Sequence, residues 1–187
     1  MFNHSPIPAP QTAAPAADGI VIAAEQAADA SLILELHERA FGPGRFARAA
    51  ERVREEGAPD RAGEGGHDRT VSFTAKRNGA LIGSVRMTPI VIAGVPGHLL
   101  GPLAVRSADT HRGVGGRLIA AACEAAKGKG RYTLLVGDAP YYARHGFAYV
   151  AGPVMPGPVD PKRLLVRWHG TAEPLSGPVR HAAVFRR

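Results

Sequence analysis

Three glycines stand close together in the middle of the chain, directly before an apolar helical pattern. Gly113, Gly115 and Gly116 fall within four residues, although a glycine inside a helix costs about 1 kcal/mol relative to alanine. Backbone N–H groups at a helix N-terminus are unpaired, and the helix dipole favours an anion beside them. Glycine lets such an anion approach the backbone closely. The stretch therefore predicts a phosphate-binding loop, and a glycine-rich turn without a ligand is the alternative. The helical spacing is carried by Val114, Leu118, Ala121, Ala122 and Ala125.

The spacing of these glycines excludes two common phosphate loops. A Walker loop needs Gly-x-x-x-x-Gly-Lys-Ser/Thr, but Leu118 stands five residues after Gly113 and no Lys-Ser follows. A dinucleotide fingerprint needs Gly-x-Gly-x-x-Gly after a first strand. Here Leu118 again occupies the third glycine position, and the loop follows the fourth expected strand. Both of these loop types are therefore excluded, and a glycine-rich turn without a ligand remains the alternative to a phosphate-binding loop of another type.

Charge and composition narrow the class of protein. The formal net charge of the 187 residues is +7, which favours anionic ligands, but the basic residues form no lysine tract and do not alternate with aromatic residues. We therefore expect no nucleic-acid partner. No run of about 18 apolar residues is present, so we expect no membrane span. The histidines have no metal-ligand spacing, and we expect no metal.

Cys123 is the one cysteine, which excludes an internal disulfide and fits a reducing, cytoplasmic location. It falls on the apolar side of the helix after the glycines, so we expect a buried core residue rather than a nucleophile.

The elements that must position the loop can be read from periodicity and turn residues. We expect the Pro/Ala-rich residues 1–18 to be disordered and residues 19–187 to form a single domain. Asn78-Gly79 predicts a hairpin turn, and 98–105 is apolar without interruption, as in a strand covered on both faces. The order predicts an α/β fold with a mixed, mostly antiparallel central sheet and flanking helices. The expected strands are 19–25, the two runs flanking 78–79, 98–105, 131–137, 147–150 and a last strand at 163–169; the expected helices are 29–41, 45–56, the one after the glycines to about 127, and 139–146; further turns are expected at 42–44 and 94–97 and a loop at 57–68.

Two stretches carry a resemblance to a known family. "LGPLAVRSADTHRGVGGRLI" resembles the acetyl-coenzyme A motif of the GNAT superfamily of N-acetyltransferases, Gln/Arg-x-x-Gly-x-Gly/Ala after a Leu-x-Val strand. Gly113 and Gly115 match its two small positions, whereas Thr110 replaces the usual Gln/Arg. "GDAPYYARHGFAYV" resembles the family's Tyr-x-x-x-Gly-Phe element. From about residue 19 to the C-terminus the chain resembles a bacterial subgroup of predicted N-acetyltransferases, and the fold expected is that of this superfamily.

The resemblance implies the layout of a site. In the family, strands four and five separate and the pantetheine arm of acetyl-CoA, the acyl donor, lies between them. That layout assigns the arm to Leu103, Ala104 and Val105, with Arg112 and Arg117 adding positive charge near the phosphates. Tyr142 takes the position of the acid that protonates the departing thiolate, with a packing role as the alternative. The pyrophosphate would lie on the backbone of His111, Arg112, Gly113, Val114, Gly115 and Gly116.

The resemblance implies an acetyl-CoA-dependent N-acetyltransferase that acts on the amine of a small molecule or peptide by direct attack on the thioester. The alternative is an acyl-CoA-binding module of the same fold without turnover. No general base can be assigned: His98 is the only titratable side chain between Met87 and Arg106, and a water chain or a neutral amine could serve instead. The acceptor pocket is expected near 41–46 and 154–168, whose basic walls suit an anionic or neutral acceptor. A homodimer is left open.

Overall fold

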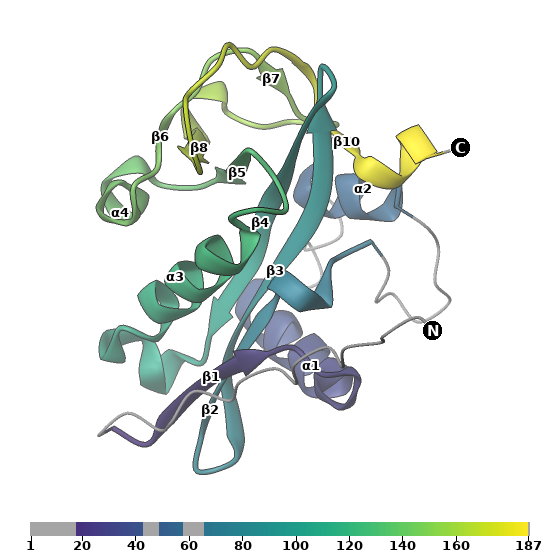
Figure 1. Ribbon diagram of the computed structural model, residues 1–187. Coiled ribbons are helices and arrows are strands. Elements are labelled where there is room, and N and C mark those ends of the chain that lie inside the picture. Colours follow the sequence, from purple (N-terminus) through teal and green to yellow (C-terminus); the bar gives the residue numbers. More distant parts are fainter. Residues whose placement is uncertain (1–17, 43–48, 58–65, 187) are drawn as a thin grey trace, which may run out of the picture.

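A computed structural model describes residues 18–42, 49–57 and 66–186. The protein is built around one strongly twisted sheet, which α3 covers on one face and α1 and α2 on the other (Figure 1). This arrangement confirms the expected mixed α/β class. The helices are α1 Ala30–Phe41, α2 Ala49–Glu55, α3 Val114–Ala126 and α4 Ala139–Tyr142, with shorter 3-10 turns at η1 Ala27–Asp29, η3 Arg69–Val71, η4 Ser107–Arg112, η5 Ala143–His145, η6 Pro161–Arg163 and η7 Ala182–Arg186.

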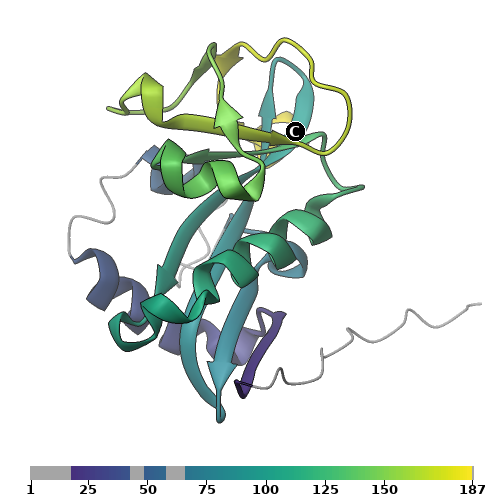
Figure 2. The same ribbon diagram turned by 90° about the vertical axis from the view of Figure 1, so that its left-hand side faces the viewer.

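The main sheet has the strand order β1-β2-β3-β4-β5-β8-β6, with β10 paired to β3 beside this path. All of its pairings are antiparallel except β4 with β5, which are joined through α3. Figure 2 shows β5, β6, β8 and α4 grouped beyond β4. The strands are β1 Ile20–Ala24, β2 Phe73–Arg77, β3 Ala80–Ile92, β4 Val95–Val105, β5 Tyr132–Val136, β6 Ala148–Tyr149, β8 Leu164–Trp168 and β10 Arg180–His181, and β7 Pro153–Val154 and β9 Gly177–Pro178 form a separate parallel pair.

Two tight turns connect β2, β3 and β4. Asn78 and Gly79 both have positive φ, at 50° and 79°, which is the hairpin geometry that their sequence predicts. The second turn is at Ala93 and Gly94, with φ of 47° and 82°, and not at 94–97. That expectation was wrong because alanine is a poor residue for positive φ and was read as part of the strand. As a result β4 begins at Val95, three residues earlier than expected.

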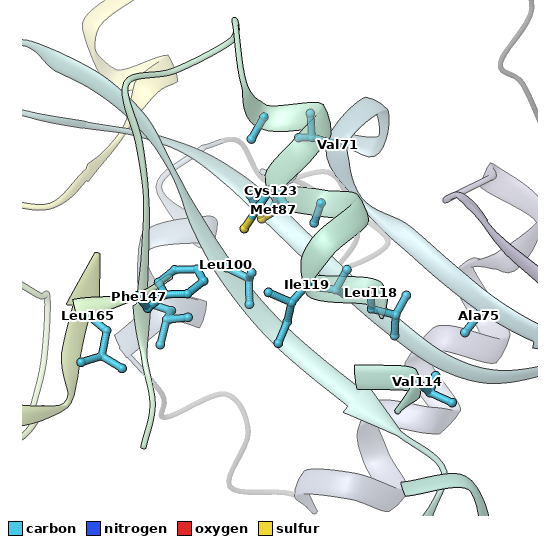
Figure 3. Close-up of a cluster of buried hydrophobic side chains, with 14 of the residues drawn as sticks. Val71, Ala75, Met87, Leu100, Val114, Leu118, Ile119, Cys123, Phe147 and Leu165 are labelled. Carbon is cyan, nitrogen blue, oxygen red and sulfur yellow. The ribbon is translucent and has the colours of Figure 1, made fainter. Parts of the chain in front are cut away.

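The helix after the glycines supplies one side of the main core. Leu118, Ile119 and Cys123 of α3 are fully buried against the sheet, together with Met87 and Leu100 (Figure 3). Cys123 is therefore a core residue, as expected, and burial raises the pKa of its thiol. A second apolar cluster, on the other side of the sheet, includes Val53 of α2.

Each end of the chain differs in one respect from what the sequence predicts. Residues 163–169 were expected to hold the last strand, but β9 and β10 follow, and β10 pairs with Ile90 and Val91 of β3. A two-residue strand carries too few positions to show a period, which is why it was missed. At the other end, residues 1–17 of the expected disordered segment lie outside the described residues, whereas Asp18 accepts hydrogen bonds from the Ile20 backbone and from Arg117.

Candidate active site

The candidate site begins where β4 and β5 separate. The two strands pair only at His98 with Thr133 and at Leu99 with Leu134. Immediately beyond, Gly101 and Pro102 of β4 stand opposite the single residue Arg86 of β3, which is a β-bulge. After the bulge β4 stays paired with β3, but β5 no longer covers its other edge. The backbone of Leu103, Ala104 and Val105 therefore lies at a sheet edge that can accept an extended ligand.

The N-terminus of α3 lies at the end of this edge. Gly113 is its N-cap, in the left-handed conformation with φ 71°, and no side chain caps the helix. A Cβ added to Gly113 would meet nothing within 4 Å, so the space in front of this turn is open. The N–H groups of Val114, Gly115 and Gly116 thus have the geometry of an anion site, which fits the phosphates of acetyl-CoA. His111 and Arg112 precede them in η4 and are exposed.

Gly115 and Gly116 have a second role, which the sequence did not indicate. A Cβ on Gly115 would lie 2.7 Å from the hydroxyl of Tyr141, and one on Gly116 would lie 3.0 Å from the ring of His145. The absence of side chains at these glycines therefore lets α4 and η5 pack directly on the first turn of α3. This contact fixes the segment that carries Tyr142.

The basic residues near the loop are held by carboxylates. Asp109 is fully buried and pairs with Arg77 and Arg106 at 2.9 Å each, and with Arg112 at 3.5 Å. Arg117, in contrast, binds Asp18 and the backbone carbonyl of Ile20, so it is directed to β1. The positive charge beside the glycine loop thus comes from the group around Asp109.

A cavity of about 730 Å³ opens between the separated strands, on the α1 and α2 side of the sheet. Its floor is the bulge region of β4, from Leu100 to Leu103. Tyr142 lies in its wall, and α1 and α2 close it from the opposite side. The cavity is lined by Leu34, His37, Phe41, Ala49, Ala50, Glu51, Arg54, Arg86, Leu100, Gly101, Pro102, Leu103, Val136, Gly137, Asp138, Tyr142, Pro158, Val159, Asp160 and Arg163.

Tyr142 combines packing with access to the cavity. Its ring is edge-on to Tyr141 and Phe147, at centroid distances of 4.9 and 5.9 Å. Burial, with smaller contributions from Tyr141 and Asp138, raises the pKa of its hydroxyl to about 12. Tyr142 therefore keeps its proton at physiological pH and can donate a hydrogen bond into the cavity. Tyr141 does not line the cavity, although it packs against the core as Tyr142 does.

His98 does not belong to the site. It is 3% exposed, it is absent from the cavity lining, and it lies in the part of β4 that pairs with β5. Burial lowers the pKa of its imidazole to about 4, so it is neutral and structural. Of the open candidates for the base, only a water chain or a neutral amine is compatible with this placement.

Three polar residues of the cavity wall were missed in the sequence. His37, Arg54 and Arg86 are 4%, 7% and 3% exposed, and all three line the cavity. Two of them had a local signal: His37 lies four residues after Ile33 on the apolar side of its helix, and Arg86 stands alone between apolar strand residues. His37 Nε2 lies 2.9 Å from Ser84 Oγ, which fixes its ring.

Comparison with known proteins decides the family. Residues 68–149 match the family described as "Acetyltransferase (GNAT) domain". The chain is also 35% identical over 129 residues to the "Uncharacterized N-acetyltransferase YjhQ" of Escherichia coli (strain K12), which covers 66% of this chain and 67% of that protein. The chain belongs to the GNAT acetyltransferases. The resemblance found in the sequence is thereby confirmed, and the protein is an acetyl-CoA-dependent N-acetyltransferase.

Solved structures agree with this assignment. The fold of the acetyltransferase is similar to that of a GNAT family protein from Brucella melitensis in complex with acetyl-CoA, with a TM-score of 0.63 and 26% identity over 90% of this chain and 99% of that one. The GNAT protein YhbS of Escherichia coli, in complex with CoA, has the same fold, with a TM-score of 0.67 and 22% identity over 98% and 97% of the two chains.

Two further findings concern the described part of the chain. It contains no helix that is long and apolar enough to cross a membrane. It also contains no group of three His, Cys, Asp or Glu residues placed to hold a metal ion.

Proposed function

We propose that the acetyltransferase transfers the acetyl group directly to an amine held in the 730 Å³ cavity, without an acyl-enzyme. The observation that carries this proposal is the continuity of the cavity with the uncovered edge of β4. The pantetheine arm would lie along Leu103–Val105, and the pyrophosphate on the backbone of residues 111–116. Both placements are supported by the strand separation and by the uncapped N-terminus of α3. The acceptor is a small-molecule or peptide amine.

In this reaction the bond between the amine nitrogen and the acetyl carbon forms, and the bond from that carbon to sulfur breaks. Acetyl-CoA supplies the activated carbonyl. The amine must be neutral to attack, and it loses one proton, while the sulfur leaves as a thiolate that finally takes one up. Backbone N–H groups at the edge of β4 are suited to polarise the carbonyl oxygen. Tyr142 is suited to donate a hydrogen bond to the departing sulfur.

Each of the three carboxylates that line the cavity already has a partner. Glu51 pairs with Arg54, Asp138 pairs with Arg163 at 3.0 Å, and Asp160 accepts a hydrogen bond from the backbone of Lys162. An ordinary alkylamine has a pKa near 10.4, so only a small fraction is neutral at pH 7. We infer that this neutral fraction, or water in the open cavity, carries the deprotonation. The rate should then rise with pH toward the pKa of the acceptor.

Thiol release from acetyl-CoA in the presence of a panel of amines tests the proposal. We expect release that depends on the amine and yields an equal amount of the N-acetyl product. Tight binding of acetyl-CoA with no amine-dependent release would instead support an acyl-CoA-binding module without turnover. A product in which an enzyme side chain carries the acetyl group would contradict direct transfer.

A further inference from the structure

Two buried arginines reach the acceptor cavity from different elements, and their hydrogen bonding differs. Arg86 of β3 donates from Nε and Nη2 to the two carboxylate oxygens of Glu25, at 3.2 and 2.8 Å. Glu25 is itself fully buried and also contacts His67 at 3.0 Å. This fork-to-fork pair fixes the Arg86 guanidinium in place, so Arg86 is a structural part of the wall.

Arg54 of α2 is held from one side only. Its Nη2 donates to Glu51, one turn earlier on the same helix, and both side chains are largely buried. Its Nη1 is buried and has no hydrogen-bond partner within the part of the chain that the structure describes. A buried guanidinium nitrogen without an acceptor is costly, and native proteins rarely leave one in that state. The missing acceptor is an oxygen, because guanidinium groups only donate.

The surroundings of Arg54 narrow the source of that oxygen. Among the other charged residues that line the cavity, Asp138 and Arg163 form an ion pair with each other. Much of the remaining wall is aliphatic or aromatic, so it offers no oxygen of its own at this place. The apolar residues of the wall include Leu34, Phe41, Leu100, Leu103, Val136 and Val159. Among the arginines that line the cavity in the described part of the chain, Arg54 is the one with a buried guanidinium nitrogen that lacks an acceptor.

We propose that the acceptor is a small amine with an apolar body and a carboxylate, and that Arg54 binds the carboxylate through Nη1. This inference rests on the proposed function, because it describes the acceptor of that same cavity. Carboxylate is the group that matches a guanidinium best, in charge and in geometry.

Matched pairs of amines provide the test. Leucine is compared with isoamylamine, phenylalanine with phenethylamine, and 6-aminohexanoate with pentylamine, so that each pair differs in the carboxylate. Thiol release from acetyl-CoA gives kcat/KM for each amine. We expect the carboxylated member of at least one pair to be preferred by tenfold or more. Equal values within all three pairs, or a preference for the carboxylate-free amines, would overturn the inference and leave direct transfer to an amine intact.

Variants of α2 assign the preference to Arg54. Arg54→Met should lower kcat/KM for the preferred carboxylated amine about ten- to a hundredfold and change that for its carboxylate-free partner by less than threefold. Arg52→Met is the matched control, because Arg52 is exposed on the same helix and does not line the cavity, and we expect no effect. Equal losses for both members of a pair would overturn the role of Arg54.

A binding measurement keeps the inference testable if Arg54→Met folds poorly or if no amine of the panel is acetylated. N-acetylleucine and N-isoamylacetamide are titrated into the CoA-bound enzyme by calorimetry, with Arg54→Lys as the second variant. We expect N-acetylleucine to bind the wild type more tightly than the neutral amide, and Arg54→Lys to reduce that difference. If neither compound binds, or if the neutral amide binds equally well, a carboxylate site at Arg54 is excluded.

Discussion

Replacing Tyr142 with phenylalanine removes one oxygen from the cavity wall and leaves the ring in its contacts with Tyr141 and Phe147. The ring supplies most of the buried area, so the melting temperature should change little. Acetyl-CoA should bind with nearly unchanged affinity, because a hydrogen bond to the sulfur strengthens only as negative charge develops there. The predicted pattern is a fall in kcat with a nearly constant KM for acetyl-CoA.

The magnitude follows from the pKa of Tyr142. Its hydroxyl has a pKa of about 12, whereas a thiol has one of about 8.5 by analogy with cysteine, so complete proton transfer to the thiolate is uphill by about 5 kcal/mol. The hydroxyl therefore acts mainly as a hydrogen-bond donor to a developing charge, which is worth about 1.5–3 kcal/mol. This corresponds to a loss of about ten- to a hundredfold in kcat.

The assay is the initial rate of thiol release at saturating acetyl-CoA, with the binding constant and melting temperature measured on the same preparations. Tyr141→Phe is the matched control, since it removes a neighbouring hydroxyl that does not line the cavity. A Tyr142→Phe enzyme that turns over at the wild-type rate would refute the reasoning and leave Tyr142 as a packing residue. A joint collapse of rate, affinity and melting temperature would show instead that the hydroxyl is structural.

Three further predictions concern the loop and stability in acid. Gly115→Ala should weaken acetyl-CoA binding, because the new Cβ would lie 2.7 Å from the Tyr141 hydroxyl and must displace it; calorimetry that shows unchanged affinity would contradict this. Burial alone would raise the pKa of Glu25, but hydrogen bonds from His67 and Arg86 lower it from 4.5 to about 2. The free energy of unfolding should therefore fall by about 3 kcal/mol as the pH drops from above 4.5 to 2. Burial lowers the pKa of the His98 imidazole from 6.5 to about 4, so the free energy of unfolding should fall by a similar amount as the pH drops from 6.5 to 4. Urea unfolding of His98→Asn should show no such loss.

Local signals in the sequence predicted the parts of the fold that depend on local geometry. Asn78-Gly79 forms its turn because both residues tolerate positive φ, and Gly113 caps α3 in the left-handed conformation for the same reason. The family and the donor followed from such motifs. Arg54 and the buried pair of Arg86 with Glu25 could not be predicted, because their burial depends on partners or walls from other elements. Glu25 lies 61 positions from Arg86, and no spacing rule relates the two.

The placement of CoA on residues 103–105 and 111–116, and the acid role of Tyr142, remain predictions. The strand edge and the helix end have the geometry that they require. The acceptor end of the site was the least predictable part, because α1, α2 and β4 each contribute several residues to one cavity, and β3 and α4 contribute one each. Such a cavity exists only after those elements have packed.

The bulge in β4 has a simple arithmetic consequence. Met87 pairs with Leu100 and Val85 with Leu103, so one residue of β3 faces two of β4. If Pro102 were deleted, Arg86 would face Gly101, each flanking pair would keep its partner, and each side chain would stay on its present face of the sheet. Neither the hydrophobic core nor the ladder with β3 needs that residue. The strand is one residue longer than its sheet requires, and the surplus is located where the edge of β4 opens toward the cavity.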